Sequence, residues 1–388
     1  MTLRLPRLRK NRSEAMTDFN ALFKHAVDSG ASDIHLQGGR QPIVRLHGNL
    51  VRVGNGTISS QELQDQIGRM VPGHMKEQTL SETGKGLDFS YTDSAAGRFR
   101  CSAFSAVGQP GMTMRSIRTV IPSLDQLHLP TTVMDIALAQ RGLTLVTGTT
   151  GSGKSTTLAA MIDLINSNYD VKIITVEDPI EFLHADKKAL ISQIEVGSDS
   201  ISFDQALRQA LRQDPDVILI GELRDVETLR MALRAADTGH QVFATVHASR
   251  AAQTIERIIA MFPPAEHKTL LSQLAHSLEA IISQRLVLLR EEGAGRRPAI
   301  EILRGGPVTE KFVLEGKLAQ LTEYIEGGES GMQSFDQHLL QMYSERLISG
   351  QEALKHANRP EALATAMRGI RYTGRPQKLN QLVTREQT

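Results

Sequence analysis

The sequence predicts an α/β protein with two domains, a smaller α+β domain followed by a larger domain built on a parallel sheet. In residues 17–118, short runs of alternating apolar and polar residues are broken by glycines, which is typical of a small antiparallel sheet. In residues 131–366, apolar runs alternate with helical patterns, as a parallel α/β sheet requires. A chain of 388 residues is long enough for two or three domains with proper cores.

The smaller domain is predicted to combine two helices with one sheet. A helical pattern begins at Thr17, places Phe19, Leu22 and Phe23 on one face, and stops at Ser29-Gly30. A second helix is expected over residues 60–70, with Ser60 as its N-cap. The expected strands are Ser32–Leu36, Pro42–Gly48, Leu50–Val53, Leu87–Tyr91, Gly97–Phe104 and Gly111–Ile117.

Residues 119–130 carry two prolines and little periodicity, so they are predicted to be a linker. Helices are expected at Phe203–Arg212 and Val226–Ala236, and mostly helical structure is expected from Ala251, with one hairpin around Gly293-Ala294-Gly295. The strands predicted for the larger domain are Leu143–Thr147, Lys172–Val176, Val217–Ile220 and Gln241–Val246.

Both ends of the chain are polar and basic. Residues 1–16 are predicted to be a flexible basic tail, with a docking segment for an acidic partner or membrane surface as the alternative. Residues 367–388 are predicted to be a second flexible tail. No apolar run approaches the roughly twenty residues that a membrane span needs, and no apolar segment follows the basic start as in a secretory signal.

Composition narrows the possible functions. The 44 basic and 43 acidic residues nearly cancel, which gives no support to a general nucleic-acid binder. The single cysteine, Cys101, excludes an intrachain disulfide and a cysteine-rich zinc site, and it fits the reducing cytoplasm.

One stretch has the spacing G-x-x-x-x-G-K-[ST] of a phosphate-binding P-loop, between an apolar run and a helical pattern. In such a loop, backbone amides and the helix N-terminus hold phosphate oxygens. Lys154 is expected to reach the β- and γ-phosphates, and Ser155 to offer its hydroxyl to Mg²⁺. The predicted ATP-binding residues are Gly148, Thr149, Thr150, Gly151, Ser152, Gly153, Lys154, Ser155 and Thr156.

Acidic residues follow two of the predicted strands, at the sheet edge where open α/β sheets bind ligands. Glu177-Asp178-Pro179-Ile180-Glu181 follows the strand Lys172–Val176, and a carboxylate there could activate the attacking water or simply belong to an Asp-Pro turn. Asp216-Val217-Ile218-Leu219-Ile220 resembles a Walker B strand, but Gly221 stands where an aspartate is typical. Glu222 is then the acid, with a role in either metal binding or water activation.

Histidines and arginines give weaker signals. His240 and His247 stand at the two ends of one strand, about 23 Å apart, so they cannot share a metal. His247, at the carboxyl end, is either structural or in contact with the γ-phosphate. Arginines also alternate along the predicted first sheet, either as a solvated face or as donors to phosphate, at Arg98, Arg100 and Arg115.

Together these motifs resemble the type II/type IV secretion and pilus ATPase superfamily, and within it the PilT family of pilus-retraction ATPases. The resemblance covers about Asp18 to Leu363 and includes the P-loop, Glu177–Glu181, Gly221-Glu222 and the two histidines. Supporting segments are Ser32–Leu36, Arg98–Arg100, Gln284–Val287 and Gly331–Gln337.

The resemblance implies a PAS-like N-terminal domain, a RecA-like ATPase domain and a homohexamer that converts ATP hydrolysis, with Mg²⁺, into movement. It implies that Glu177 is the catalytic glutamate, Glu222 the Walker B acid, His240 and His247 the histidine-box residues, and the three arginines candidates to reach the nucleotide. The expected location is cytoplasmic, peripheral to the inner membrane through a platform protein of a pilus or secretion machine.

Two features bear on the choice within the superfamily. Extension ATPases usually carry an extra N-terminal domain and a four-cysteine zinc insert. This chain has one cysteine and begins almost directly with the expected PAS-like domain, which favours retraction. Residues Val308–Glu315 depart from the Ala-Ile-Arg-Asn-Leu-Ile-Arg-Glu segment of retraction ATPases, so an accessory PilU-like, conjugation or secretion ATPase is the nearest alternative. A RecA-type nucleic-acid motor, or a nucleotide-binding subunit without turnover, are the alternatives of other classes.

Overall fold

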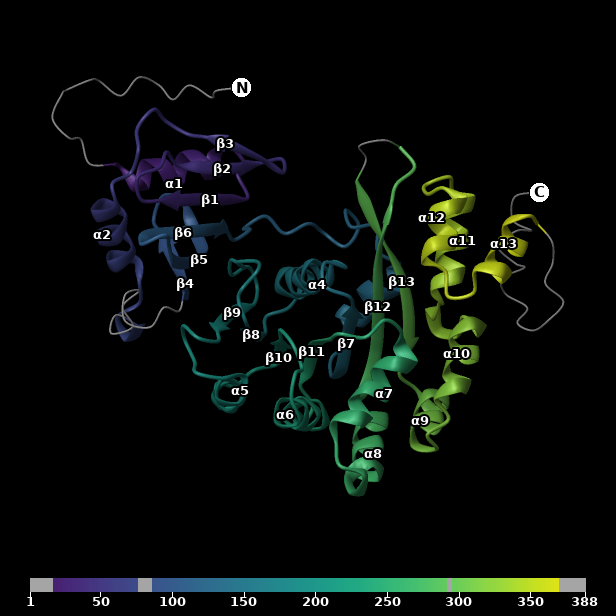
Figure 1. Cartoon of the computed structure of the whole chain (residues 1–388). Helices are drawn as coiled ribbons and strands as arrows, with labels where there is room; N and C mark the ends of the chain where they lie inside the picture. Colours follow the sequence, from purple (N-terminus) through teal and green to yellow (C-terminus); the bar gives the residue numbers. More distant parts are fainter. Residues whose placement is uncertain (1–16, 76–85, 292–294, 370–388) are drawn as a thin grey trace. The chain divides into compact units, whose positions relative to one another are not determined.

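The computed structural model describes residues 17–75, 86–291 and 295–369 (Figure 1). The predicted tail at residues 1–16, nearly all of the tail at 367–388, and Gly293 and Ala294 of the predicted hairpin lie outside these residues. The chain divides into two compact units, residues 17–119 together with Gly197–Asp199, and the remainder from Val120. Among the described residues, no helix is long and apolar enough to cross a membrane.

The first unit is an antiparallel sheet of six strands in the order β3-β2-β1-β6-β5-β4, with two helices, as the sequence predicts. Phe23 of α1 packs against Phe99 of β5 with ring centroids 5.8 Å apart, and both rings are fully buried. The elements are α1 (Phe19–Asp28), β1 (Asp33–Gln37), β2 (Ile43–Leu46), β3 (Asn49–Arg52), α2 (Ser60–Met70), β4 (Leu87–Asp93), β5 (Gly97–Ala106) and β6 (Gln109–Ser116).

The N-cap of α2 differs from the prediction. Ser59, not Ser60, caps this helix: its hydroxyl accepts from the Glu62 backbone amide at 3.2 Å, and the Glu62 carboxylate accepts from the Ser59 amide at 2.9 Å. This reciprocal pair requires a serine three residues before the glutamate. Because two serines are adjacent, the spacing to Glu62 decides between them.

The second unit is a mixed sheet of seven strands in the order β13-β12-β7-β11-β10-β8-β9. The strands from β12 to β9 in this order are parallel to their neighbours, and only β13 is antiparallel. The strands are β7 (Gly142–Gly148), β8 (Lys172–Glu177), β9 (Leu190–Glu195), β10 (Val217–Ile220), β11 (Gln241–Val246), β12 (Leu278–Leu288) and β13 (Arg296–Arg304).

Two of these strands were not foreseen at their full extent. The region after Ala251 was predicted to be mostly helical with one hairpin, but β12 and β13 are long strands that extend the main sheet beyond β7. The apolar run at the start of β12 fits a buried helix as well as a strand, so periodicity alone does not separate them. The sequence does not predict edge strand β9, because its three apolar and three polar residues follow no clear alternation and all but Glu195 are at least partly exposed.

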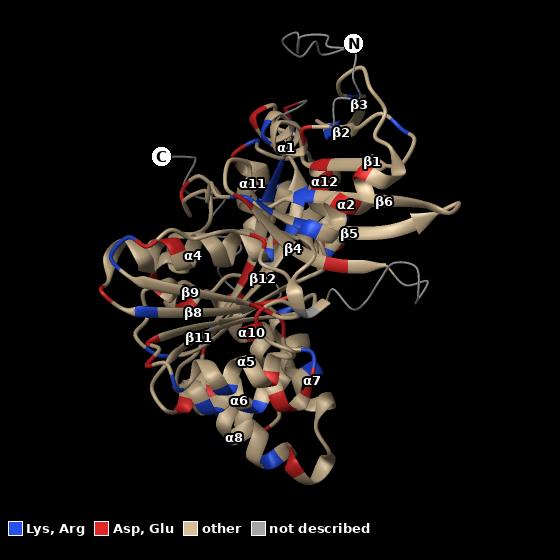
Figure 2. Ribbon diagram, turned by 90° about the vertical axis from the view of Figure 1, so that its left-hand side faces the viewer, with Lys and Arg blue, Asp and Glu red and all other residues tan. Residues whose placement is uncertain are grey.

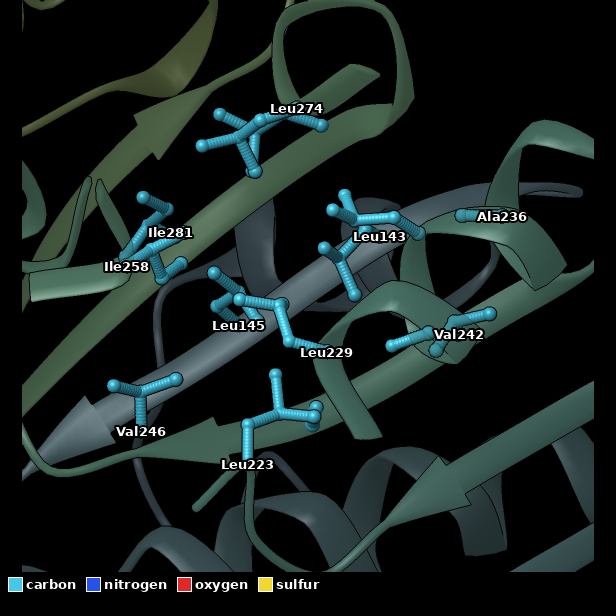
Figure 3. Packing of buried hydrophobic residues seen from close by; sticks show 14 of the residues in the cluster. Leu143, Leu145, Leu223, Leu229, Ala236, Val242, Val246, Ile258, Leu274 and Ile281 are labelled. Atoms are coloured by element: carbon cyan, nitrogen blue, oxygen red, sulfur yellow. The ribbon is translucent and has the colours of Figure 1, made fainter. Parts of the chain in front are cut away.

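Helices cover both faces of this sheet. Leu143 and Leu145 of β7 pack with Leu229 of α6 and Ile258 of α7 on one face (Figure 3). Val146 packs with residues of α3 and α4 on the other face, which is why β7 is apolar without alternation. The helices are α3 (Thr131–Ala137), α4 (Lys154–Asn168), α5 (Phe203–Ala210), α6 (Val226–Asp237), α7 (Ala251–Met261), α8 (His267–Ser277), α9 (Pro307–Leu314), α10 (Leu318–Gly327), α11 (Phe335–Ser344), α12 (Gly350–His356) and α13 (Pro360–Met367).

Candidate active site

The glycine-rich loop connects β7 to α4 at the carboxyl edge of the sheet, the position that a P-loop occupies. Its conformation requires glycine: φ is +149° at Gly148, +77° at Gly151 and +94° at Gly153, which directly precedes α4. A Cβ on Gly148 would meet the Ser152 hydroxyl and would lie 2.6 Å from the carbonyl oxygen of Gln284 on β12. The loop is therefore fixed by close contact with a neighbouring strand.

Gly148→Ala is expected to destabilise the second unit by about 2 kcal/mol or more, because it adds backbone strain and steric overlap at one position. ATP hydrolysis should fall with it, since the loop must move to make room. Denaturant unfolding and phosphate release check this prediction. Gly56→Ala is the control, because a Cβ there meets nothing within 4 Å; equal stability of the two variants would contradict the prediction.

Lys154 is buried and its ammonium group donates to the carbonyls of Gly148 at 3.0 Å and Thr149 at 3.1 Å. Burial lowers the pKa of Lys154, while the carboxylates of Glu222 and Glu181 oppose that shift. The Lys154 ammonium group thus lies inside the loop, where a bound phosphate would be held. Phosphate oxygens are charged acceptors and bind an ammonium group more strongly than the peptide carbonyls do.

The two predicted acids follow neighbouring strands. Glu177 ends β8, and Glu222 follows β10, which pairs with β8 in parallel. A Cβ on Gly221 would lie 3.2 Å from the Cα of Glu177, and the Gly221 amide donates to the Val176 carbonyl at 2.7 Å. The close approach of the two strand ends therefore explains why glycine, not aspartate, follows the apolar run, and why the acid is one residue later.

Glu177 is held by two side chains that the sequence did not indicate. Its Oε1 accepts from the Thr175 hydroxyl at 2.7 Å and from the Gln193 carboxamide at 3.2 Å. Burial raises the pKa of the Glu177 carboxyl, and these hydrogen bonds only partly offset that effect. A carboxylate with a raised pKa is a better proton acceptor at neutral pH.

Glu222 lies between two cationic or potentially cationic side chains. Its Oε2 accepts from Arg224 Nε at 2.7 Å, and its Oε1 lies 3.2 Å from His247 Nε2. A second guanidinium nitrogen of Arg224 lies 3.3 Å from Asp178. The structure thus groups Glu222 and His247 at the sheet edge that carries the P-loop.

His240 is not part of this group. It precedes β11, at the opposite edge of the sheet from His247, and its Nδ1 lies 2.9 Å from the Ala235 carbonyl oxygen at the end of α6. Within this chain the structure therefore places one of the two predicted histidines beside Glu222, at the sheet edge that carries the P-loop, and gives the other a contact with a helix end.

The three predicted arginines lie in the first unit, on adjacent strands. Arg98 and Arg100 alternate with buried Phe99 along β5, and Arg115 of β6 is the cross-strand partner of Arg100, so all three project from the sheet face opposite the core. Arg115 Nε donates to Asp33 at 2.8 Å. Their relation to a nucleotide stays a prediction.

A cavity of about 340 Å³ lies beside the P-loop, on the side away from the acids. It was not predicted, because β12 was not. In the sheet order, β11 and β10 flank β7 on one side and β12 and β13 on the other. Its lining includes Gly153, Thr156, Gln284, Leu286, Arg297 and Pro298.

A phosphate-binding loop, a lysine inside it and two acids on adjacent strand ends define a P-loop ATPase of the α/β class. The comparisons with known proteins agree. The family model for Type II/IV secretion system protein matches residues 9–310. The chain belongs to this family, and it is an ATPase of the secretion and pilus motor type.

Similar relatives are known from Pseudomonas aeruginosa. The type IV pilus retractation ATPase PilT is 40% identical over 345 residues, covering 89% of this chain and 99% of that protein. The type IV pilus ATPase PilU is 39% identical over 344 residues, covering 88% and 89%. Among solved structures, the pilus retraction motor PilT with bound ADP matches with a TM-score of 0.82 and 39% identity, over 90% of this chain and 99% of that one.

Proposed function

We propose that this protein is a Mg²⁺-dependent ATPase motor that powers retraction of a type IV pilus. The observation that carries the proposal is the joint presence of the P-loop and the two acids at one sheet edge, in a chain that matches PilT over 99% of that protein's length.

In this proposal the loop amides and Lys154 hold the β- and γ-phosphates of ATP, and the γ-phosphate points toward β11 and β10. Glu177 accepts the proton of the attacking water, while its Oε1 is held by hydrogen bonds from the Thr175 hydroxyl and the Gln193 carboxamide. The nucleoside then lies on the β12 side, in the 340 Å³ cavity, whose size suits a base and ribose. The triphosphate therefore passes over the carboxyl end of β7.

The Ser155 hydroxyl and the Glu222 carboxylate would hold Mg²⁺. Both are hard oxygen donors, and two protein donors suit a cation that keeps several waters and substrate oxygens. When bound, the cation neutralises charge on the β- and γ-phosphates. Arg224 and His247 keep the Glu222 carboxylate at this edge.

We propose further that the protein works as a homohexamer on the cytoplasmic side of the inner membrane, bound to a platform protein of the pilus machine. Closing of one unit on bound nucleotide, and its release after hydrolysis, would supply the movement. Arg98, Arg100 and Arg115 are candidates to reach the nucleotide within such a ring.

A PilU-like accessory role is the second candidate, favoured by the similar identity to PilU. The segment that departs from retraction ATPases is nevertheless helical, as α9 (Pro307–Leu314). A nucleic-acid motor has less support, because the 44 basic and 43 acidic residues nearly cancel. Acidic and basic residues are also intermixed along α6 (Figure 2).

Deletion of the gene tests the proposed direction of force. We expect more surface filaments together with loss of twitching motility, because assembly would continue without retraction. Filaments are counted by electron microscopy and motility is scored on agar, with the complemented strain as control. Fewer filaments would indicate an assembly or secretion motor instead. Unchanged filaments with weakened motility would indicate the accessory role.

A further inference from the structure

Three polar side chains share one face of the paired strands β8 and β9: the acid Glu177, Thr175 and Gln193. Thr175 and Glu177 are two residues apart on β8, so they project to the same side. Gln193 of β9 is the register partner of Thr175 in the parallel pair, and it projects to that side as well. Neither Thr175 nor Gln193 has a role in the nucleotide chemistry described above, apart from its bond to Glu177.

The orientation of the Gln193 carboxamide is fixed by the backbone. Its Oε1 accepts from the His184 amide at 2.9 Å, and its Nε2 donates to the Phe182 carbonyl at 2.9 Å. A backbone amide can only donate and a carbonyl can only accept, so the carboxamide cannot be flipped. The second Nε2 hydrogen is then directed to Glu177 Oε1, at 3.2 Å.

We propose that Gln193 is a positioning residue for Glu177: it holds Oε1 and so fixes the orientation of the carboxylate that accepts the water's proton. The inference rests on the proposed role of Glu177 as the base. Gln193 itself does not contact the nucleotide. It ties the base to the segment 182–184, which connects β8 to β9, so that the carboxylate keeps one rotamer while it is partly desolvated.

In the described part of the chain, few charged groups face Glu177. The Glu181 carboxylate raises the pKa of Glu177, while the Glu181 backbone amide, Thr175 and Gln193 lower it. Glu195 is the register partner of Glu177 on β9 and accepts from the Ile180 amide at 3.3 Å. Asp178 is paired with Arg224. His184 is neutral near pH 7, because burial lowers its pKa to about 4.

Gln193→Leu removes the hydrogen bond and keeps similar volume. Without this donor the pKa of Glu177 rises, so the acidic limb of the kcat profile should move to higher pH. At pH 7 we expect kcat to fall about tenfold, the loss of one hydrogen bond to a charged group, with KM for ATP nearly unchanged. Steady-state phosphate release from pH 5 to pH 9 measures both quantities.

Thr175→Val is the second variant, because it removes an independent bond to the same oxygen and should move the acidic limb in the same direction. Gln209→Leu, at an exposed position of α5, is the matched control and should keep the parent profile. Circular dichroism and ADP affinity verify folding. Parent-like acidic limbs in both variants would overturn this inference alone. If the unmodified chain released no phosphate, the proposed function would fail and this inference with it.

Discussion

Lys154→Ala is expected to abolish ATP hydrolysis and to weaken nucleotide binding about 100-fold, the loss of a strong hydrogen bond between charged groups. The ammonium group is buried inside the loop, 3.0 Å from the Gly148 carbonyl, where it can transfer to phosphate oxygens. It is the charged donor of the motif, and its contribution is greatest where negative charge develops during phosphoryl transfer. Phosphate release and titration with a fluorescent ADP analogue measure the two effects.

Lys188→Ala is the control for this experiment. Lys188 is exposed on the same unit, and its ammonium group donates to the Asn168 carbonyl at the C-terminal end of α4, not to the loop. It should behave as the parent protein does. Turnover by Lys154→Ala within tenfold of the parent rate would show that the loop does not bind the reacting phosphates, and would contradict the assignment of the site.

Glu177→Gln is expected to lower kcat by about 10²–10⁴-fold, the usual contribution of a positioned base, while ATP and ADP still bind. Glutamine has the same shape but cannot accept the water's proton as a carboxylate does. Single-turnover hydrolysis and equilibrium binding separate the two steps. In the parent protein, activity should be lost on acidification as Glu177 protonates, at a pH above that of an ordinary glutamate, because burial raises its pKa.

Glu181→Gln distinguishes between the carboxylates that the sequence left open. Glu181 is exposed, in contrast to the desolvated Glu177, and we expect its loss to change kcat little. If Glu181→Gln lost activity and Glu177→Gln kept it, the base would be Glu181, and the role of Gln193 as a positioning residue would fall with the assignment of Glu177.

The P-loop could be predicted from sequence because its chemistry is local: nine consecutive residues, from the end of a strand to the first turn of a helix, contain every group that it needs. The antiparallel first unit and the strands β7, β8, β10 and β11 were predicted for a similar reason, since their apolar patterns are strong. Glu177 and Glu222 followed from their places at strand ends.

The partners of these residues could not be predicted, because they depend on which strands are neighbours. Gln193 reaches Glu177 only because β9 pairs with β8 in one register, and β9 itself gave no clear pattern. The contact of Gln284 with Gly148 and the cavity beside the loop likewise depend on β12 lying next to β7. His247 could be favoured over His240 from the sequence, because it stands at the carboxyl end of its strand. The parallel pairing of β11 with β7 puts this end at the edge that carries the P-loop.

A crystal structure with Mg²⁺ and a slowly hydrolysed ATP analogue tests the central claim most directly. The account predicts phosphates on the backbone amides between β7 and α4, with Lys154 turned from the loop carbonyls to the phosphates. It also predicts that the adenine base of the nucleotide lies in the cavity beside β12. Density for the triphosphate at any other place, with this loop empty, would contradict it.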